Sequence, residues 1–118
     1  MHKLSLPELA QGLQQGEFSS HELTTHYLRR IAQHKELNAF ISINENSALE
    51  AAAAADKQIK AGRAKPLTGI PMAHKDIFCT TSMPTTCGSK MLEHFNSPYQ
   101  ATVVTKLAEQ GVVLVGKT

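Results

Sequence analysis

The chain has 118 residues, 42% of them hydrophobic and 19% charged, with a formal net charge of +2. This balance is ordinary for a globular domain, and it argues against an intrinsically disordered chain. The four Phe, two Tyr and no Trp, without any run of Lys or Arg, also argue against a nucleic-acid-binding surface on this chain.

Two capping boxes predict the first two helices. Ser5 is followed three residues later by Glu8, and Ser19 by Glu22, so each pair can satisfy free N–H groups at the start of a helix. The first helix is expected to end near residue 15, because Gly16 follows. The second is expected to run to about residue 35. Its apolar stripe consists of Leu23, Tyr27, Leu28 and Ile31.

The middle of the chain predicts a strand and then a helix. Residues 38–43, NAFISI, are rich in β-branched and aromatic side chains, which favour a strand. The next segment contains five consecutive Ala, the residue with the highest helix propensity, and it ends at Gly62. Asn44 and Ser47 are both candidates for its N-cap. We expect the wide Ala face of this helix to lie flat on a sheet.

The second half of the chain continues the alternation. A proline restricts its predecessor to extended geometry, so residues 70–78 are predicted to be extended. A small and polar loop is expected over residues 80–90, a helix over 101–110 and a strand over 112–115. This order of elements indicates an α/β layered fold.

We interpret residues 1–118 as one segment of a single domain. The predicted strand near the end is strongly apolar, and no other segment evidently completes its sheet. Since an uncovered apolar strand edge favours aggregation, we expect the chain to be truncated within its fold.

Gly111–Thr118, GVVLVGKT, fits the phosphate-binding pattern G-x-x-x-x-G-K-[ST]. Such a loop curls its backbone N–H groups around phosphate. The three valines between the two glycines are β-branched and favour extended backbone instead. We therefore interpret the segment as a buried strand. Nucleotide binding is the alternative, and it predicts that ATP would protect the protein against melting.

Nothing in the sequence predicts a metal site, a leader or a membrane anchor. Cys79 and Cys87 have a spacing that matches no zinc pattern, so we expect two free thiols in a reducing compartment. The N-terminus has no apolar core of signal-peptide length, and no stretch approaches the roughly 20 apolar residues of a membrane span. We expect a cytoplasmic protein without membrane contact.

Lys75 is the main candidate for chemistry. It lies in IPMAHKDIF, an otherwise largely apolar extended run. Such a lysine either reaches the surface with its ammonium group or is buried for a function. Burial lowers the pKa of a lysine from about 10.4 toward neutrality, which allows the neutral amine to take a proton from a hydroxyl nucleophile. Spacing by itself leaves both interpretations open.

Three segments together resemble the N-terminal part of the amidase signature family. They are LTGIPMAHKDIF, TTCGSKML and SPYQATVVTKLAEQGVVLVGKT, in that order. The series is most similar to the A subunits of glutamyl-tRNA(Gln) amidotransferases, which share G-[IV]-P-x-x-x-K-D, T-T-C-x-S-K-M-L and V-x-x-G-[KR]-T. Such an ordered series is far more specific than one short motif, and the likeness runs along nearly the whole chain.

The resemblance implies an α/β/α sandwich around a large mixed sheet and a Ser-cis-Ser-Lys catalytic triad. Lys75 matches the triad lysine, which would deprotonate the nucleophilic serine through the bridging cis-serine. Both serines of that triad belong to a Gly/Ser-rich segment beyond Thr118. Ser82 and Ser89 lack this context, so we expect the 118 residues alone to be inactive.

The resemblance also implies substrates and partners. The serine would attack glutamine and release ammonia, which would pass to the B subunit of the amidotransferase complex. The B subunit would use ATP and magnesium to activate glutamate on Glu-tRNA(Gln), while the small C subunit would support assembly. This chain itself is expected to bind no cofactor and no metal.

The roles of two neighbours of Lys75 stay open, and so do two alternative functions of the chain. His74 and Asp76 either support Lys75 by fixing the local backbone or charge balance, or are ordinary polar neighbours. Within the enzyme class, the chain could belong to another amidase that acts on a small amide. Outside it, the chain could be a non-catalytic interaction module.

Overall fold

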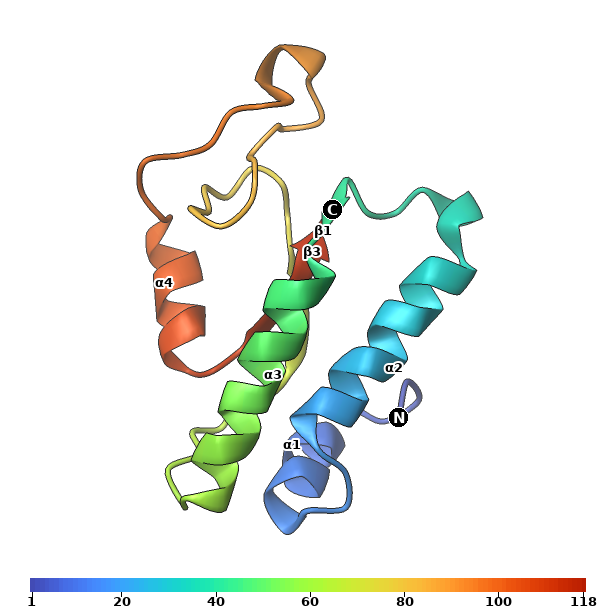
Figure 1. Cartoon of the computed structure of the whole chain (residues 1–118), viewed down its shortest axis with the longest axis vertical. Helices are drawn as coiled ribbons and strands as arrows, with labels where there is room; N and C mark the ends of the chain where they lie inside the picture. The colour runs from blue at the N-terminus through green and yellow to red at the C-terminus, as the bar shows by residue number, and fades with distance from the viewer.

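The structure is a computed structural model that describes residues 1–118. The chain folds into four α-helices and three β-strands, joined by loops and two short 3-10 helices, and Figure 1 shows how they are arranged. The helices are α1 Leu6–Gln15, α2 Ser20–Gln33, α3 Glu45–Lys60 and α4 Thr102–Glu109, with the 3-10 helices η1 Lys35–Leu37 and η2 Lys90–Leu92. The strands are β1 Ser42–Ile43, β2 Pro71–His74 and β3 Val113–Lys117.

Both predicted capping boxes are formed. The Glu8 carboxylate accepts from the backbone N–H of Ser5 at 2.6 Å, and that of Glu22 accepts from Ser19 at 2.8 Å. Gly16 ends α1 in the left-handed conformation, with φ of +73°. The boundaries of the first helix are therefore confirmed.

Two elements in the middle differ from the prediction in length. Helix α2 ends at Gln33 because His34 leaves helical geometry, with φ −121° and ψ 39°, and η1 follows. Strand β1 comprises only Ser42 and Ile43 instead of residues 38–43. Asn38 has a positive φ of 48° and so lies outside the extended run, whereas the Ile41 N–H donates to the Lys117 carbonyl of β3 at 2.8 Å.

The three strands form a mixed sheet in the order β1-β3-β2. Strand β3 is central: it pairs antiparallel with β1 and parallel with β2. The β2–β3 register shifts between Met72 and Ala73, so His74 lies opposite Lys117. Without the register shift, His74 would lie opposite Gly116. The irregularity thus decides which side chains of β2 share a face with Lys117.

Helices α2 and α3 cover one face of β3. Figure 1 shows α3 in front of the sheet, with α2 on one side of it and α4 on the other. The main buried cluster joins α2, α3 and β3 through Leu28, Ala48, Ala52, Val113 and Val115. Two Ala of α3 are fully buried there, as the predicted flat Ala face requires. A second cluster, beneath α1, consists of Leu9, Leu13, Leu23 and Ile70.

Gly111–Thr118 contains the predicted buried strand. Strand β3 runs two residues further than residue 115, because Gly116 and Lys117 pair with both neighbouring strands. The N–H groups of Val113 and Thr118 donate to the carbonyls of Ile70 and His74, both at 2.9 Å. These N–H groups are held in the sheet and do not form a phosphate nest.

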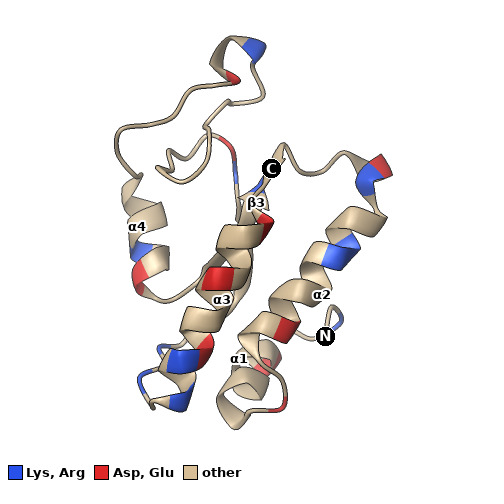
Figure 2. Cartoon of the chain, viewed as in Figure 1, with Lys and Arg blue, Asp and Glu red and all other residues tan.

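The surface carries charges of both signs. Figure 2 shows positions of both signs of charge on α2 and on α3. None of the helices combines the length and apolar character that crossing a lipid bilayer requires. Several large apolar side chains are exposed in the segment between β2 and α4, including Met91 at 95% and Tyr99 at 65%.

Candidate active site

Lys75 directly follows β2, and its backbone is held on both sides by one residue of the neighbouring chain segment. The Thr118 N–H donates to the His74 carbonyl at 2.9 Å, and the Asp76 N–H donates to the Thr118 carbonyl at 2.8 Å. Lys75 Nζ donates to the same carbonyl at 3.2 Å, and its side chain is exposed. In the structure of residues 1–118 the Lys75 side chain therefore lies at the surface, which is one of the two positions that the sequence allowed.

Asp76 lies beside Lys75 in sequence and is 1% exposed. Its Oδ2 accepts from the Thr86 hydroxyl and, at 3.1 Å, from the Thr86 backbone N–H. Burial alone would raise the pKa of the Asp76 carboxyl, but the hydrogen bonds from Thr86 and Lys117 outweigh it and hold the pKa below the ordinary value. Asp76 is therefore a buried carboxylate that joins several segments.

Lys117, near the end of β3, supplies the opposite charge. Its Nζ lies 3.0 Å from Asp76 Oδ1, and its side chain is 0% exposed. The ammonium group also donates to the Pro84 carbonyl at 3.0 Å and to Thr85 Oγ1 at 2.7 Å. The two hydrogen bonds go to Pro84 and Thr85, and the contact with Asp76 Oδ1 is that of an ion pair. We call this arrangement the Asp76–Lys117 ion pair.

Sequence reasoning did not identify Lys117 as a site residue. Lys117 is the last residue of a strand in which Val113, Val115 and Gly116 are also buried. A lysine in such a buried strand requires a buried acceptor. This pattern was the available signal, but the acceptor comes from a distant segment that the sequence does not position.

His74 is also buried, at 5% exposure. Burial lowers the pKa of its imidazole, and the positive charge of Lys117 lowers it further. His74 is therefore a neutral imidazole at neutral pH. The three predicted site residues thus form one consecutive segment, in which His74 and Asp76 point into the fold while Lys75 is exposed.

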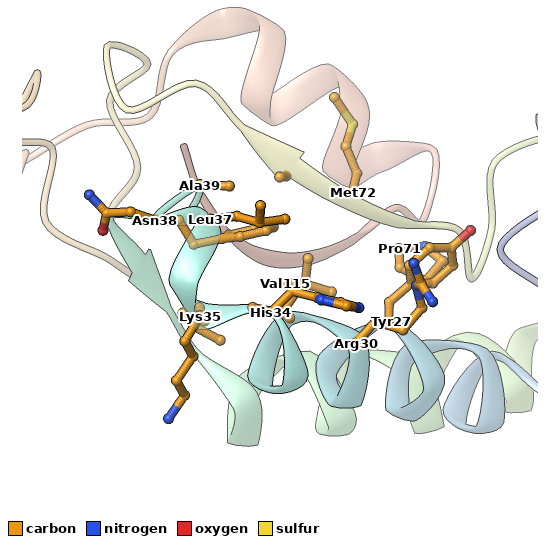
Figure 3. A pocket seen from close by; sticks show the side chains of 14 residues that line it. Tyr27, Arg30, His34, Lys35, Leu37, Asn38, Ala39, Pro71, Met72 and Val115 are labelled. Atoms are coloured by element: carbon orange, nitrogen blue, oxygen red, sulfur yellow. The ribbon is translucent and has the colours of Figure 1, made fainter.

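A separate hollow lies between α2 and β2 and has a volume of about 550 Å³. Figure 3 shows Tyr27 and Arg30 at one end of it and Asn38 and Ala39 at the other. Nine of its fourteen lining residues are hydrophobic, and none of the predicted site residues is among them. The hollow and the Lys75 segment are therefore distinct features. The structure contains no cluster of three or more His, Cys, Asp or Glu side chains arranged to hold a metal ion.

The architecture is that of solved amidases. The native peptide amidase from Stenotrophomonas maltophilia matches with a TM-score of 0.92 at 36% identity, over 98% of this chain and 24% of that one. A bacterial aryl acylamidase of the amidase signature family matches with a TM-score of 0.89 at 25% identity, over 98% and 25% of the two chains. The fold is therefore the α/β fold of the amidase signature enzymes, as the sequence resemblance implied.

The sequence comparisons give the family. A family model described as Amidase matches residues 22–118. A protein from Nitrosococcus oceani, named as the A subunit of a glutamyl-tRNA(Gln) amidotransferase, is 54% identical over 119 residues, covering 100% of this chain and 25% of its own length. A protein of the same name from Legionella pneumophila is 52% identical, covering 100% and 24%. The chain belongs to the amidase family, and it spans about a quarter of the length of these relatives.

Proposed function

We propose that this chain is the N-terminal part of the glutaminase subunit of a tRNA-dependent amidotransferase. The observation that carries the proposal is the identity of 52% to 54% along the whole chain with proteins named as A subunits of glutamyl-tRNA(Gln) amidotransferases. In this role the full-length protein hydrolyses glutamine and supplies ammonia that converts Glu-tRNA(Gln) to Gln-tRNA(Gln).

In the proposed reaction, Lys75 is the general base. Its neutral amine takes a proton from a bridging serine, which takes one from the serine nucleophile. The nucleophile forms a bond to the side-chain amide carbon of glutamine, and the C–N bond breaks as the nitrogen leaves with a proton as ammonia. Water then hydrolyses the acyl-enzyme to glutamate. Both serines would come from the part of the protein beyond Thr118.

The backbone around Lys75 supports this role. Thr118 bonds to the residues on both sides of Lys75, and Asp76 is anchored to Thr86 and Lys117. A base that must meet a hydroxyl proton at hydrogen-bond distance needs such a fixed starting point. Because the nucleophile is not among residues 1–118, we expect this segment alone to be inactive.

The proposal includes partners. The B subunit of the complex would receive the ammonia and activate glutamate on Glu-tRNA(Gln) with ATP and magnesium, and the C subunit would support assembly. This chain would bind neither ATP nor a metal ion itself. The complex would work in the cytoplasm, where the tRNA is charged.

A second candidate is an amidase that acts on another amide. The 36% identity and TM-score of 0.92 with the Stenotrophomonas maltophilia peptide amidase favour it. An assay of ammonia release by the full-length protein, purified with its partner subunits, separates the two. Turnover of glutamine supports the amidotransferase role. Turnover of peptide or aryl amides without ammonia from glutamine overturns it.

A non-catalytic module is the remaining alternative. It predicts that residues 1–118 form a stable monomer that unfolds cooperatively. We expect the isolated segment to be poorly folded, because it exposes Ile77, Met91 and Tyr99 at 57%, 95% and 65%. Circular dichroism during thermal unfolding of the isolated segment tests this, and a sharp transition would favour the module.

A further inference from the structure

The Asp76–Lys117 ion pair contains a fully buried lysine that the proposed reaction does not use. Its ammonium group lies 3.0 Å from Asp76 Oδ1, 3.0 Å from the Pro84 carbonyl and 2.7 Å from Thr85 Oγ1. From this geometry we infer that Lys117 is a positioning residue for Lys75 and acts through Asp76. The inference rests on the proposed function, in which Lys75 is the base.

Asp76 is held at each of its polar groups. Its N–H donates to the Thr118 carbonyl at 2.8 Å, its carbonyl accepts from the Cys87 N–H at 3.0 Å, and its carboxylate holds Thr86 and Lys117. Asp76 is the next residue after Lys75. Fixing its backbone and side chain therefore fixes the peptide plane from which Lys75 extends.

Lys75 follows β2, and Asp76 begins a turn that the Phe78 N–H closes by donating to the Lys75 carbonyl at 3.1 Å. The two side chains differ in burial, because Asp76 is 1% exposed whereas Lys75 is exposed. Lys117 faces Asp76 on the buried side, whereas Lys75 Nζ lies by the Thr118 carbonyl on the other side. Holding Asp76 inward therefore keeps Lys75 pointing outward, toward the side where a serine from the rest of the protein would meet it.

The ion pair also holds the loop that follows Lys75. The Lys117 ammonium binds Pro84 and Thr85, while the Asp76 carboxylate binds Thr86. The ion pair thus attaches the loop to the residues that follow β2. Without it, Pro84 and Thr85 would lose their bonds to the Lys117 ammonium group, and residues next to Lys75 would gain freedom.

Stability alone does not account for the pair. Replacing both members of a buried ion pair by uncharged residues of similar volume is often neutral or stabilising, because burying two charges is costly. Removing only one member is strongly destabilising, since it leaves an unpaired buried charge. Experiments can therefore separate the effect of the pair on folding from its effect on Lys75.

The test uses the full-length protein with its partner subunits and measures glutamine hydrolysis per folded enzyme, below the melting temperature. The double variant Lys117→Met, Asp76→Asn removes both charges, keeps the volumes similar and leaves a carboxamide that can still bond to Thr86. We expect it to fold and to lose kcat on the order of 10²-fold, the effect of a misplacement of about 1 Å. KM for glutamine should change much less, because Lys75 acts on the proton of the nucleophile and does not bind substrate.

The single variant Lys117→Met measures how much an unpaired Asp76 carboxylate destabilises the fold. We expect it to melt at a lower temperature than the double variant, with a similar loss of kcat per folded enzyme. The control is Lys106→Met, which makes the same chemical change at an exposed position of α4 and should leave both melting temperature and kcat unchanged.

The outcomes separate the inference from the proposed function. If the double variant melts like the wild type and keeps wild-type kcat, Lys117 serves folding only and the inference is overturned. If Lys75→Ala itself retains near-normal glutamine hydrolysis, the proposed function fails whatever Lys117 does. Loss of kcat in both Lys75→Ala and the folded double variant supports both.

Discussion

Asp56 on α3 caps α2 by accepting from the Ser20 N–H, 36 residues away in the chain, at 2.7 Å through Oδ1. Its Oδ2 accepts from the His21 N–H at 3.1 Å. The first N–H groups of a helix have no partner within the helix, and a negative charge there also interacts favourably with the helix dipole. One half-buried carboxylate thus joins the two helices that cover the sheet.

Asp56→Ala is expected to lower the free energy of unfolding by about 1–2 kcal/mol, the usual cost of losing a helix cap. Glu50→Ala is the matched control, because Glu50 is an exposed carboxylate on the same helix. Thermal unfolding of the full-length protein measures both variants. Equal melting temperatures for the two would show that the contact between α2 and α3 does not depend on this cap.

Gly116 lies where β3 approaches β1 most closely. A Cβ atom at Gly116 would lie 2.5 Å from the Ser42 carbonyl oxygen, which is backbone, and 3.0 Å from Phe40. Gly116→Ala must therefore displace β1 and is expected to destabilise the protein by about 1–3 kcal/mol, as overpacking does.

Gly62→Ala is the comparison for Gly116→Ala. Gly62 has φ of +68° but open space around it, so only the cost of left-handed backbone applies, about 1 kcal/mol. Chemical denaturation of both variants shows which of the two substitutions lowers the free energy of unfolding more. A Gly116→Ala variant that is as stable as the wild type would mean that β1 is not held against β3 in the way described.

Lys75→Ala is expected to abolish glutamine hydrolysis without changing stability. The side chain is exposed and makes one hydrogen bond, to the Thr118 carbonyl at 3.2 Å, so little packing is lost. Ammonia release and the melting temperature are measured on the same preparation, with Lys106→Ala as the control. Near-normal ammonia release would refute the assignment of Lys75 as the base.

His74 predicts how stability depends on pH. Burial, and secondarily Lys117, lower its pKa in the folded protein, whereas the unfolded chain takes up a proton near the ordinary value of about 6.5. As the pH falls below about 6.5, the unfolded state binds more protons than the folded state, so the free energy of unfolding decreases. The loss continues down to the lowered pKa and then stops.

His74→Gln is expected to remove this part of the pH dependence. Melting temperatures of the wild type and the variant are compared between about pH 7 and pH 5, the range around the ordinary histidine pKa, with His94→Gln, an exposed position, as the control. The wild type should lose more stability over this range than His74→Gln does. Parallel curves would show that His74 takes up its proton equally well in the folded protein.

Local sequence signals predicted the helices well because they depend on neighbouring residues. The Ser5–Glu8 and Ser19–Glu22 boxes determine where α1 and α2 begin, and both form as predicted. The Ala-rich run predicted α3, and its N-cap is Asn44, whose side chain accepts from Ser47 N–H at 3.3 Å. The β-branched character of residues 112–115 was sufficient to distinguish a strand from a phosphate-binding loop.

The details of the candidate site were decided by tertiary structure. Residues 38–43 have the composition of a strand, but only the two residues that meet β3 pair with it. The register shift after Met72 places His74 opposite Lys117, and no property of the Met72 side chain indicates it. These features arise from the fit between segments that are far apart in the sequence.

The sequence by itself determined the family, the order of helices and strands, and an extended segment leading into Lys75, although it predicted that segment to reach residue 78, whereas β2 ends at His74. Each depends on residue types and spacings within one stretch of chain. Only the tertiary structure decided that Asp76 and Lys117 form a buried ion pair, because an acceptor for a buried lysine is identified by distance in space. A buried charge needs a partner, and the fold determines which residue is close enough to be that partner.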